Sequence, residues 1–211
     1  MVSTYTKIDA VFAILLFVLL MYINYVVGLL LIRKQIYLGV PISFIIIIVC
    51  VVLVRIRKQK LASIGFTLKN AGKSLLSGAV FGIILSFFLN VLPKILAGMQ
   101  IIPINRILYN LFYYFIVISL SEEVVFRGYI QTRIYGLIKY DVWAVVVTGF
   151  LFYLMHLPFQ MLVNDLKINI VHMITIIVMH VIMNFLYRKH NSLVAPTVFH
   201  GLINFAADLL M

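Results

Sequence analysis

Charged residues are scarce in this sequence, and acidic residues are the scarcest of all. Only 11% of the 211 residues are charged, with 6 acidic side chains against 17 basic ones, whereas a soluble domain has about 25% charged residues. Hydrophobic residues make up 64% of the chain, against about 45–50% in a soluble domain. This excess of apolar surface excludes an ordinary soluble fold and indicates a membrane protein.

Cysteine is almost absent, because Cys50 is the only one. A single cysteine excludes an intramolecular disulfide. Nucleic acid binding is also not expected, although the formal net charge is +11. The lysines and arginines lie in short segments between apolar runs, where membrane topology requires them.

Long apolar runs fill most of the chain. A helix needs about 20 apolar residues to cross a bilayer core of about 30 Å, whereas barrel strands are about 10 residues of strict alternation. The runs here are long and continuous, so the sequence predicts an all-α, polytopic transmembrane helix bundle of about seven spans. We expect a single integral membrane domain over residues 1–211, with a catalytic core at approximately 75–210. The predicted spans are 10–32, 36–54, 75–97, 107–126, 142–162, 168–187 and 192–210.

The basic residues predict how the chain lies in the membrane. With the N-terminus in the cytoplasm, twelve lysines and arginines face inward and five face outward. Because cytoplasmic loops carry the excess of basic residues, we expect a cytoplasmic N-terminus and an outside C-terminus, in a bacterial cytoplasmic membrane. The five outward residues are Arg33, Lys34, Lys94, Arg106 and Lys167.

Glutamate occurs only twice in the chain, and both glutamates lie in an apolar run. Ionisable groups at membrane depth are costly and indicate a functional site. On a helix, Glu123 and Arg127 are one turn apart in the order that favours an ion pair. Glu122 points about 100° away and is left free for chemistry in a desolvated site. The alternative is a structural salt bridge at the cytoplasmic edge of the membrane.

Two later apolar runs carry further polar residues. His156 lies one turn after Phe152, and His200 shares a helix face with Asn204. These side chains are sufficient to hydrolyse a peptide bond. The carboxylate can take a proton from water, the imidazoles can position the water or protonate the leaving amine, and the amide can bind the oxyanion. A divalent metal such as zinc, held by Glu122, His156 and His200, is the alternative way of activating water.

Taken together, these motifs resemble those of the CPBP intramembrane proteases, also called the CAAX-protease and bacteriocin-processing or Abi family. The similarity extends over residues 81–205 and includes a short proline-containing helix entry before His200. It implies an endopeptidase that cleaves a membrane-associated peptide or a lipidated, CAAX-like tail. The motifs are Glu122-Glu123-x-x-x-Arg127, Phe152-x-x-x-His156 and His200-x-x-x-Asn204.

The resemblance also implies a role for each motif residue. Glu122 would be the general base, assisted by His156, while His200 and Asn204 would stabilise the oxyanion. Glu123, Arg127 and Phe152 would support them. The resemblance leaves open whether a metal takes part, and the HExxH motif of zinc peptidases and the GxGD motif of aspartyl peptidases are both absent.

The mechanism requires a long fourth helix. If that helix stopped near Phe126, Glu122 would lie too close to the membrane edge to meet His156. We therefore predict that the helix continues past Arg127 toward Gly136 and that the site opens to cytoplasmic water. Two other functions remain open: a non-catalytic immunity or regulatory protein that binds a partner with the same fold, and a transporter or proton relay.

Overall fold

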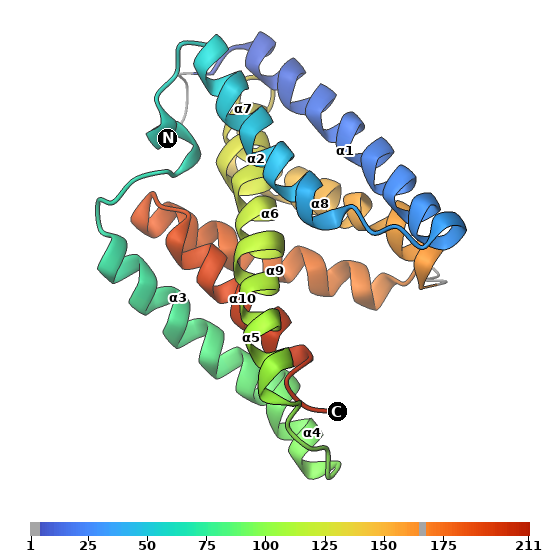
Figure 1. Ribbon diagram of the computed structural model, residues 1–211. Helices are drawn as coiled ribbons and strands as arrows, with labels where there is room; N and C mark the ends of the chain where they lie inside the picture. The colour runs from blue at the N-terminus through green and yellow to red at the C-terminus, as the bar shows by residue number, and fades with distance from the viewer. Residues whose placement is uncertain (1–4, 165–167) are drawn as a thin grey trace.

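The computed structural model describes residues 5–164 and 168–211. This part of the chain is helical throughout and holds no β-strand, only an isolated bridge between Ile101 and Leu210. The elements are α1 (Lys7–Lys34), α2 (Gly39–Ile56), η1 (Leu61–Ile64), α3 (Ala71–Ser86), η2 (Phe87–Val91), α4 (Leu92–Leu96), α5 (Ile104–Phe112), η3 (Tyr113–Leu120), α6 (Ser121–Glu123), η4 (Val124–Ile130), α7 (Gln131–Ile134), α8 (Asp141–Val163), α9 (Ile170–His190) and α10 (Val194–Ala207). The predicted all-α bundle is confirmed (Figure 1).

Six helices of the described chain are long and apolar enough to span a membrane. They are Lys7–Lys34, Gly39–Ile56, Ala71–Leu96, Ile104–Ile134, Asp141–Val163 and Ile170–His190. These match the first six predicted spans. The seventh predicted span, residues 192–210, contains α10, which has only 14 residues and is about 21 Å long at 1.5 Å per residue.

The helix α10 is short because its last residues leave the helix for a bridge to another loop. Gln100 and Met211 exchange two backbone hydrogen bonds, of 2.9 and 3.0 Å. The ammonium group of Lys94 donates to the carbonyls of Ala207 and Leu210 at the end of α10. A cation at a helix C-terminus satisfies carbonyls that have no partner within the helix. The C-terminus is therefore fixed beside the loop between α4 and α5.

Small residues let α3 pack closely against α10. They recur every fourth position on α3, at Ser74, Gly78, Gly82 and Ser86, and all four are buried. A Cβ added at Gly78 would lie 2.4 Å from the backbone oxygen of Ala195. In membranes, where lipid is as apolar as the helices, such close backbone approach is a main source of helix association.

The fourth span is one continuous helix of 31 residues, Ile104–Ile134. It runs from the lower to the upper part of Figure 1 through α5, α6 and α7. The prediction that this helix continues past Arg127 is thus confirmed. Two π-helical stretches, η3 and η4, lie on either side of the glutamates in α6, and π-helical turns within α-helices are frequent at functional sites.

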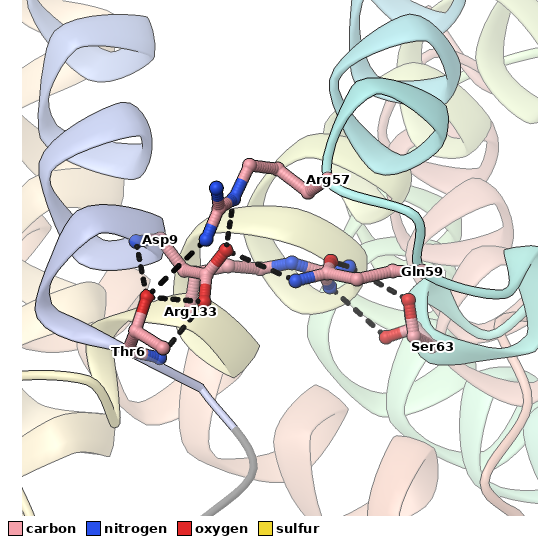
Figure 2. A network of polar contacts seen from close by, with 6 residues as sticks. All are labelled: Thr6, Asp9, Arg57, Gln59, Ser63 and Arg133. Carbon is pink, nitrogen blue, oxygen red and sulfur yellow. Dashed lines mark hydrogen bonds and ion pairs between the residues drawn. The ribbon is translucent and has the colours of Figure 1, made fainter.

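A polar network joins the start of α1, the end of α2 and the end of the fourth span (Figure 2). Arg57 Nε donates to Asp9 Oδ1 at 2.9 Å, and Thr6 and Asp9 form a capping box at the start of α1. Arg133, fully buried, donates to Gln59 Oε1 at 2.6 Å and to Ser63 Oγ at 2.7 Å. These bonds fix the end of the helix that carries both glutamates.

Candidate active site

The structure brings the predicted site residues from three helices to one cavity of about 650 Å³. Glu122 comes from α6, His156 from α8, and His200 and Asn204 from α10. Their side chains converge although 82 positions separate Glu122 from Asn204 in the sequence. The convergence on which the enzymatic interpretation depends is therefore present.

Both histidines approach the same oxygen of Glu122. The Nε2 atoms of His156 and His200 lie 3.7 and 3.8 Å from Glu122 Oε2. The three side chains are partly exposed, at 18% for Glu122, 24% for His156 and 11% for His200. No donor among the described residues bonds to Glu122 Oε2. The space between the three groups suits a small polar molecule such as water.

The proton positions on the two imidazoles follow from their other partners. His156 Nδ1 lies 2.7 Å from the carbonyl oxygen of Phe152. Since a carbonyl only accepts, Nδ1 carries the proton, and in neutral His156 the lone pair is on Nε2, facing Glu122. His200 Nδ1 lies 2.9 Å from the Glu123 carboxylate and donates to it in the same way. Each imidazole is thus oriented by a group behind it.

The supporting residues form a buried ion pair. Arg127 Nη1 lies 3.0 Å from Glu123 Oε1, and both side chains are fully buried. The Arg127 guanidinium also lies over the ring of Phe152, 4.4 Å from its centroid, which is a cation–π contact. The salt bridge lies inside the bundle and not on its surface, and the depth of the pair in a membrane stays a prediction.

Phe152 holds the two imidazoles as well as the arginine. Its ring contacts the ring of His156 edge to face at 4.9 Å between centroids and that of His200 at 6.3 Å. Gly201 lets α10 approach the fourth span, because a Cβ there would lie 2.7 Å from the ring of Phe115. Aromatic packing and one glycine therefore set the distances between the three helices.

The cavity extends from Glu122 toward one end of the bundle. Its lining residues come from the second half of α1, the first half of α2 and the second half of α8, and on the fourth span none lies beyond Phe126. The chain around Arg127 and Arg133 is buried instead. Packed side chains therefore fill the bundle between Glu122 and the end of the fourth span, while the expectation that the site opens to cytoplasmic water stays a prediction.

Several residues of the cavity were not predicted. His172 and Gln160 line it, as do three tyrosines at positions 37, 113 and 114. Gln160 lies one helical turn after His156, so its helical spacing is the signal that could have put it on the same face. Nothing in the local sequence pattern ties His172 or the three tyrosines to the motifs.

The donor atoms of the site are of the kind that binds a metal. Ligand histidines usually donate their second N–H to a carboxylate or a backbone carbonyl, as His200 and His156 do here. Within residues 5–164 and 168–211, however, no group of three or more His, Cys, Asp or Glu side chains is arranged as a metal site. The donor set fits a divalent metal only after side-chain movement.

Comparison with known protein families found a match in the second half of the chain. Residues 104–206 are similar to the family of type II CAAX prenyl endopeptidases described as Rce1-like. This segment begins with the fourth span and ends two residues after Asn204, so it contains all three motifs. Searches of curated proteins and of solved structures found no match.

Proposed function

We propose that this chain, whose residues 104–206 are similar to the Rce1-like CAAX endopeptidases, cleaves a peptide with a water molecule activated by Glu122. The family hydrolyses peptide bonds, and six helices able to span a membrane make the chain an intramembrane enzyme. One observation carries the proposal. The Nε2 atoms of two oriented histidines lie within 3.8 Å of the free oxygen of Glu122.

In this proposal, a water molecule lies between Glu122 Oε2 and the two imidazoles. The carboxylate takes a proton from the water as its oxygen attacks the scissile carbonyl. His156 orients the water through Nε2, because its Nδ1–H is held by the carbonyl of Phe152. The proton on Glu122 then passes to the leaving nitrogen as the C–N bond breaks, so Glu122 returns to its charged form.

The oxyanion of the tetrahedral intermediate requires donors on the side of α10. Asn204 offers its amide N–H, and His200 offers an Nε2–H when both of its nitrogens carry protons. The Glu123 carboxylate, 2.9 Å from Nδ1 of His200, orients that ring toward the cavity. Donors that are fixed before the reaction contribute most to transition-state stabilisation in a site shielded from water.

The second form of the proposal involves a divalent metal such as zinc. Glu122, His156 and His200 would hold it, and the metal would supply a bound water of lowered pKa and a Lewis acid for the carbonyl. Glu123 and the carbonyl of Phe152 would then keep the ligand histidines in the tautomer that binds through Nε2. The two forms predict different responses to chelation.

The test is cleavage of prenylated and unprenylated CAAX-type peptides by the purified protein in liposomes. We expect Glu122→Gln to lower kcat by about 10²–10⁴-fold, the usual contribution of a general base, without loss of thermal stability. Asp141→Asn is the matched control, because it makes the same change in a carboxylate paired with Arg188 at the start of α8. Cleavage that survives Glu122→Gln would refute the proposal.

A zinc chelator separates the two forms. If water alone is activated, cleavage persists after dialysis against 1,10-phenanthroline, and the protein contains no stoichiometric metal by mass spectrometry. If a metal takes part, cleavage is lost and returns with added zinc. Peptide binding without any cleavage by the parent protein would instead support the non-catalytic alternative of an immunity or regulatory protein.

A further inference from the structure

Asp208 differs from the other acidic residues that the structure describes. Each of the others lies within 3.7 Å of a nitrogen of an arginine or a histidine. Asp208 is exposed, and it forms no ion pair with any of the described residues. A carboxylate that no cation of the chain neutralises is free to bind a cation from outside it. The acidic residues with partners are Asp9, Glu122, Glu123 and Asp141.

The position of Asp208 is not explained by the stability of α10. Asp208 is the C-cap residue of that helix, and a negative charge at a helix C-terminus is unfavourable because the helix dipole is negative there. The ammonium group of Lys94 binds the carbonyls of Ala207 and Leu210, on either side of Asp208 in the chain, and not the carboxylate. The end of α10 is thus satisfied without Asp208.

Tyr114 holds the Asp208 carboxylate at the rim of the cavity. The Tyr114 hydroxyl donates to Asp208 Oδ2, and Tyr114 itself lines the cavity. On α10, His200, Asn204 and Asp208 follow one another at intervals of four residues, so they lie along one side of the helix. The carboxylate is therefore placed one turn beyond Asn204, on the side that carries the candidate site.

The distance from Asp208 to the candidate water site follows from two contacts. His200 Nε2 lies 3.8 Å from Glu122 Oε2, and Asp208, eight residues after His200, bonds to Tyr114, eight residues before Glu122. The fourth span and α10 are therefore antiparallel here, and eight residues of helix are about 12 Å long. An extended peptide covers this distance in about three or four residues.

Aromatic rings surround the Asp208 partner. The ring of Tyr113 stacks on that of Tyr109, with 5.7 Å between centroids, and contacts the ring of Tyr114 edge to face at 5.4 Å. Tyr113 lines the cavity as well. The faces of aromatic rings attract ammonium and guanidinium groups. A carboxylate beside tyrosine rings is therefore suited to a lysine or arginine side chain.

From these contacts we propose that Asp208 and the tyrosines beside it bind a basic residue of the substrate, about three or four positions from the scissile bond. The inference rests on the proposed function of Glu122, because it takes the water site as the place of cleavage. It makes Asp208 a residue that selects the substrate. Since Asp208 is remote from the reacting atoms, its contribution should appear in KM and not in kcat.

The test compares peptides that differ in the charge of one side chain. CAAX-type peptides carry lysine, norleucine or glutamate, placed in turn at each position around the scissile bond. Norleucine keeps the length of the lysine chain and removes its charge. Cleavage is measured with the purified protein in nonionic detergent, so that charged lipid head groups do not compete for the carboxylate.

We expect KM to be about tenfold lower for the lysine peptide than for the norleucine peptide at the favoured position, the size of a hydrogen bond to a charged group. Asp208→Asn should abolish this difference. Asp208→Lys should reverse the preference, so that the glutamate peptide has the lowest KM. Asp141→Asn is the matched control, because Asp141 is paired with Arg188, and it should keep the lysine preference.

A lysine preference that survives Asp208→Asn would overturn the inference. An equal rise in KM for all three peptides would also overturn it, because that result would show that Asp208 only balances the charge of Lys94. Thermal unfolding of each variant checks that the fold is retained. Should Asp208→Lys fail to fold, the isosteric Asp208→Asn still decides the question.

Binding to the Glu122→Gln variant distinguishes failure of this inference from failure of the proposed function. Fluorescence anisotropy measures the affinity of the same peptides without requiring cleavage. If lysine is preferred through Asp208 but Glu122→Gln still cleaves, the role of Asp208 is correct and that of Glu122 is wrong. If cleavage requires Glu122 but lysine is not preferred, the proposed function stands and Asp208 does not select the substrate.

Discussion

One oxygen of Glu123 serves two partners: Oε1 lies 2.9 Å from Nδ1 of His200 and 3.0 Å from Nη1 of Arg127. The same carboxylate therefore neutralises a buried guanidinium and orients an imidazole of the candidate site. Its neighbour Glu122 has the opposite character, since it is partly exposed in the cavity. Adjacent residues of one helix are thus divided between a buried ion pair and a partly exposed carboxylate.

Glu123→Gln should impair both stability and cleavage. The change leaves Arg127 charged and without its counter-ion in the interior, which costs about 3–5 kcal/mol. It also weakens the hydrogen bond that orients the His200 ring, because an amide oxygen is a poorer acceptor than a carboxylate. We expect a lower midpoint of thermal unfolding in detergent, and a fall in kcat with little change in KM.

The double variant Glu123→Gln with Arg127→Met separates these two effects. Removing both charges should restore much of the stability, because no unpaired charge stays buried, while kcat stays low because His200 has lost its carboxylate. A double variant that is no more stable than Glu123→Gln would contradict the ion-pair argument.

Phe152→Leu should lower kcat while preserving the fold. Leucine fills much of the same space but loses the cation–π contact with Arg127, which is worth about 0.5–2 kcal/mol, and the ring contacts with both histidines. Freer imidazoles position water less well. Steady-state kinetics with a labelled peptide and thermal unfolding measure the two effects.

Phe150→Leu is the control for this experiment, since Phe150 is on the same helix and is 44% exposed. It should leave both kinetics and unfolding close to those of the parent. Equal kinetics for the two variants would show that Phe152 does not position the histidines.

Gly78→Ala should destabilise the protein even though alanine is the better helix former. The new Cβ would lie 2.4 Å from the backbone oxygen of Ala195, so α10 must shift, and overpacking of this kind costs about 1–3 kcal/mol. Because α10 carries His200 and Asn204, cleavage should fall too. Unfolding in detergent and peptide cleavage are measured on the same samples.

Gly72→Ala makes the same change at an earlier position on α3, where the added Cβ meets nothing within 4 Å. It should be neutral or stabilising by about 0.5–1 kcal/mol. If Gly78→Ala behaves like Gly72→Ala, close packing of α3 on α10 is not what positions the site.

The sequence predicted the helical bundle because the requirements of a bilayer are local. A membrane-spanning helix must be apolar over about 20 residues, and the sequence shows such a run for each of the first six spans. The sequence also predicted the Glu123–Arg127 ion pair, because residues four apart on a helix lie side by side. The extension of the fourth span past Arg127 followed from the depth that Glu122 needs to meet His156.

The sequence by itself determined the membrane class, the helix positions and which polar side chains have no reason to be in lipid. Only the tertiary structure decided that His200 pairs with Glu123, that Phe152 contacts three charged or polar groups, and that the cavity extends toward the start of α2. Those features depend on how six helices pack around the fourth span. Packing joins residues that are far apart in the chain. No short-range pattern in the sequence predicts which end of the helix bundle is filled by side chains.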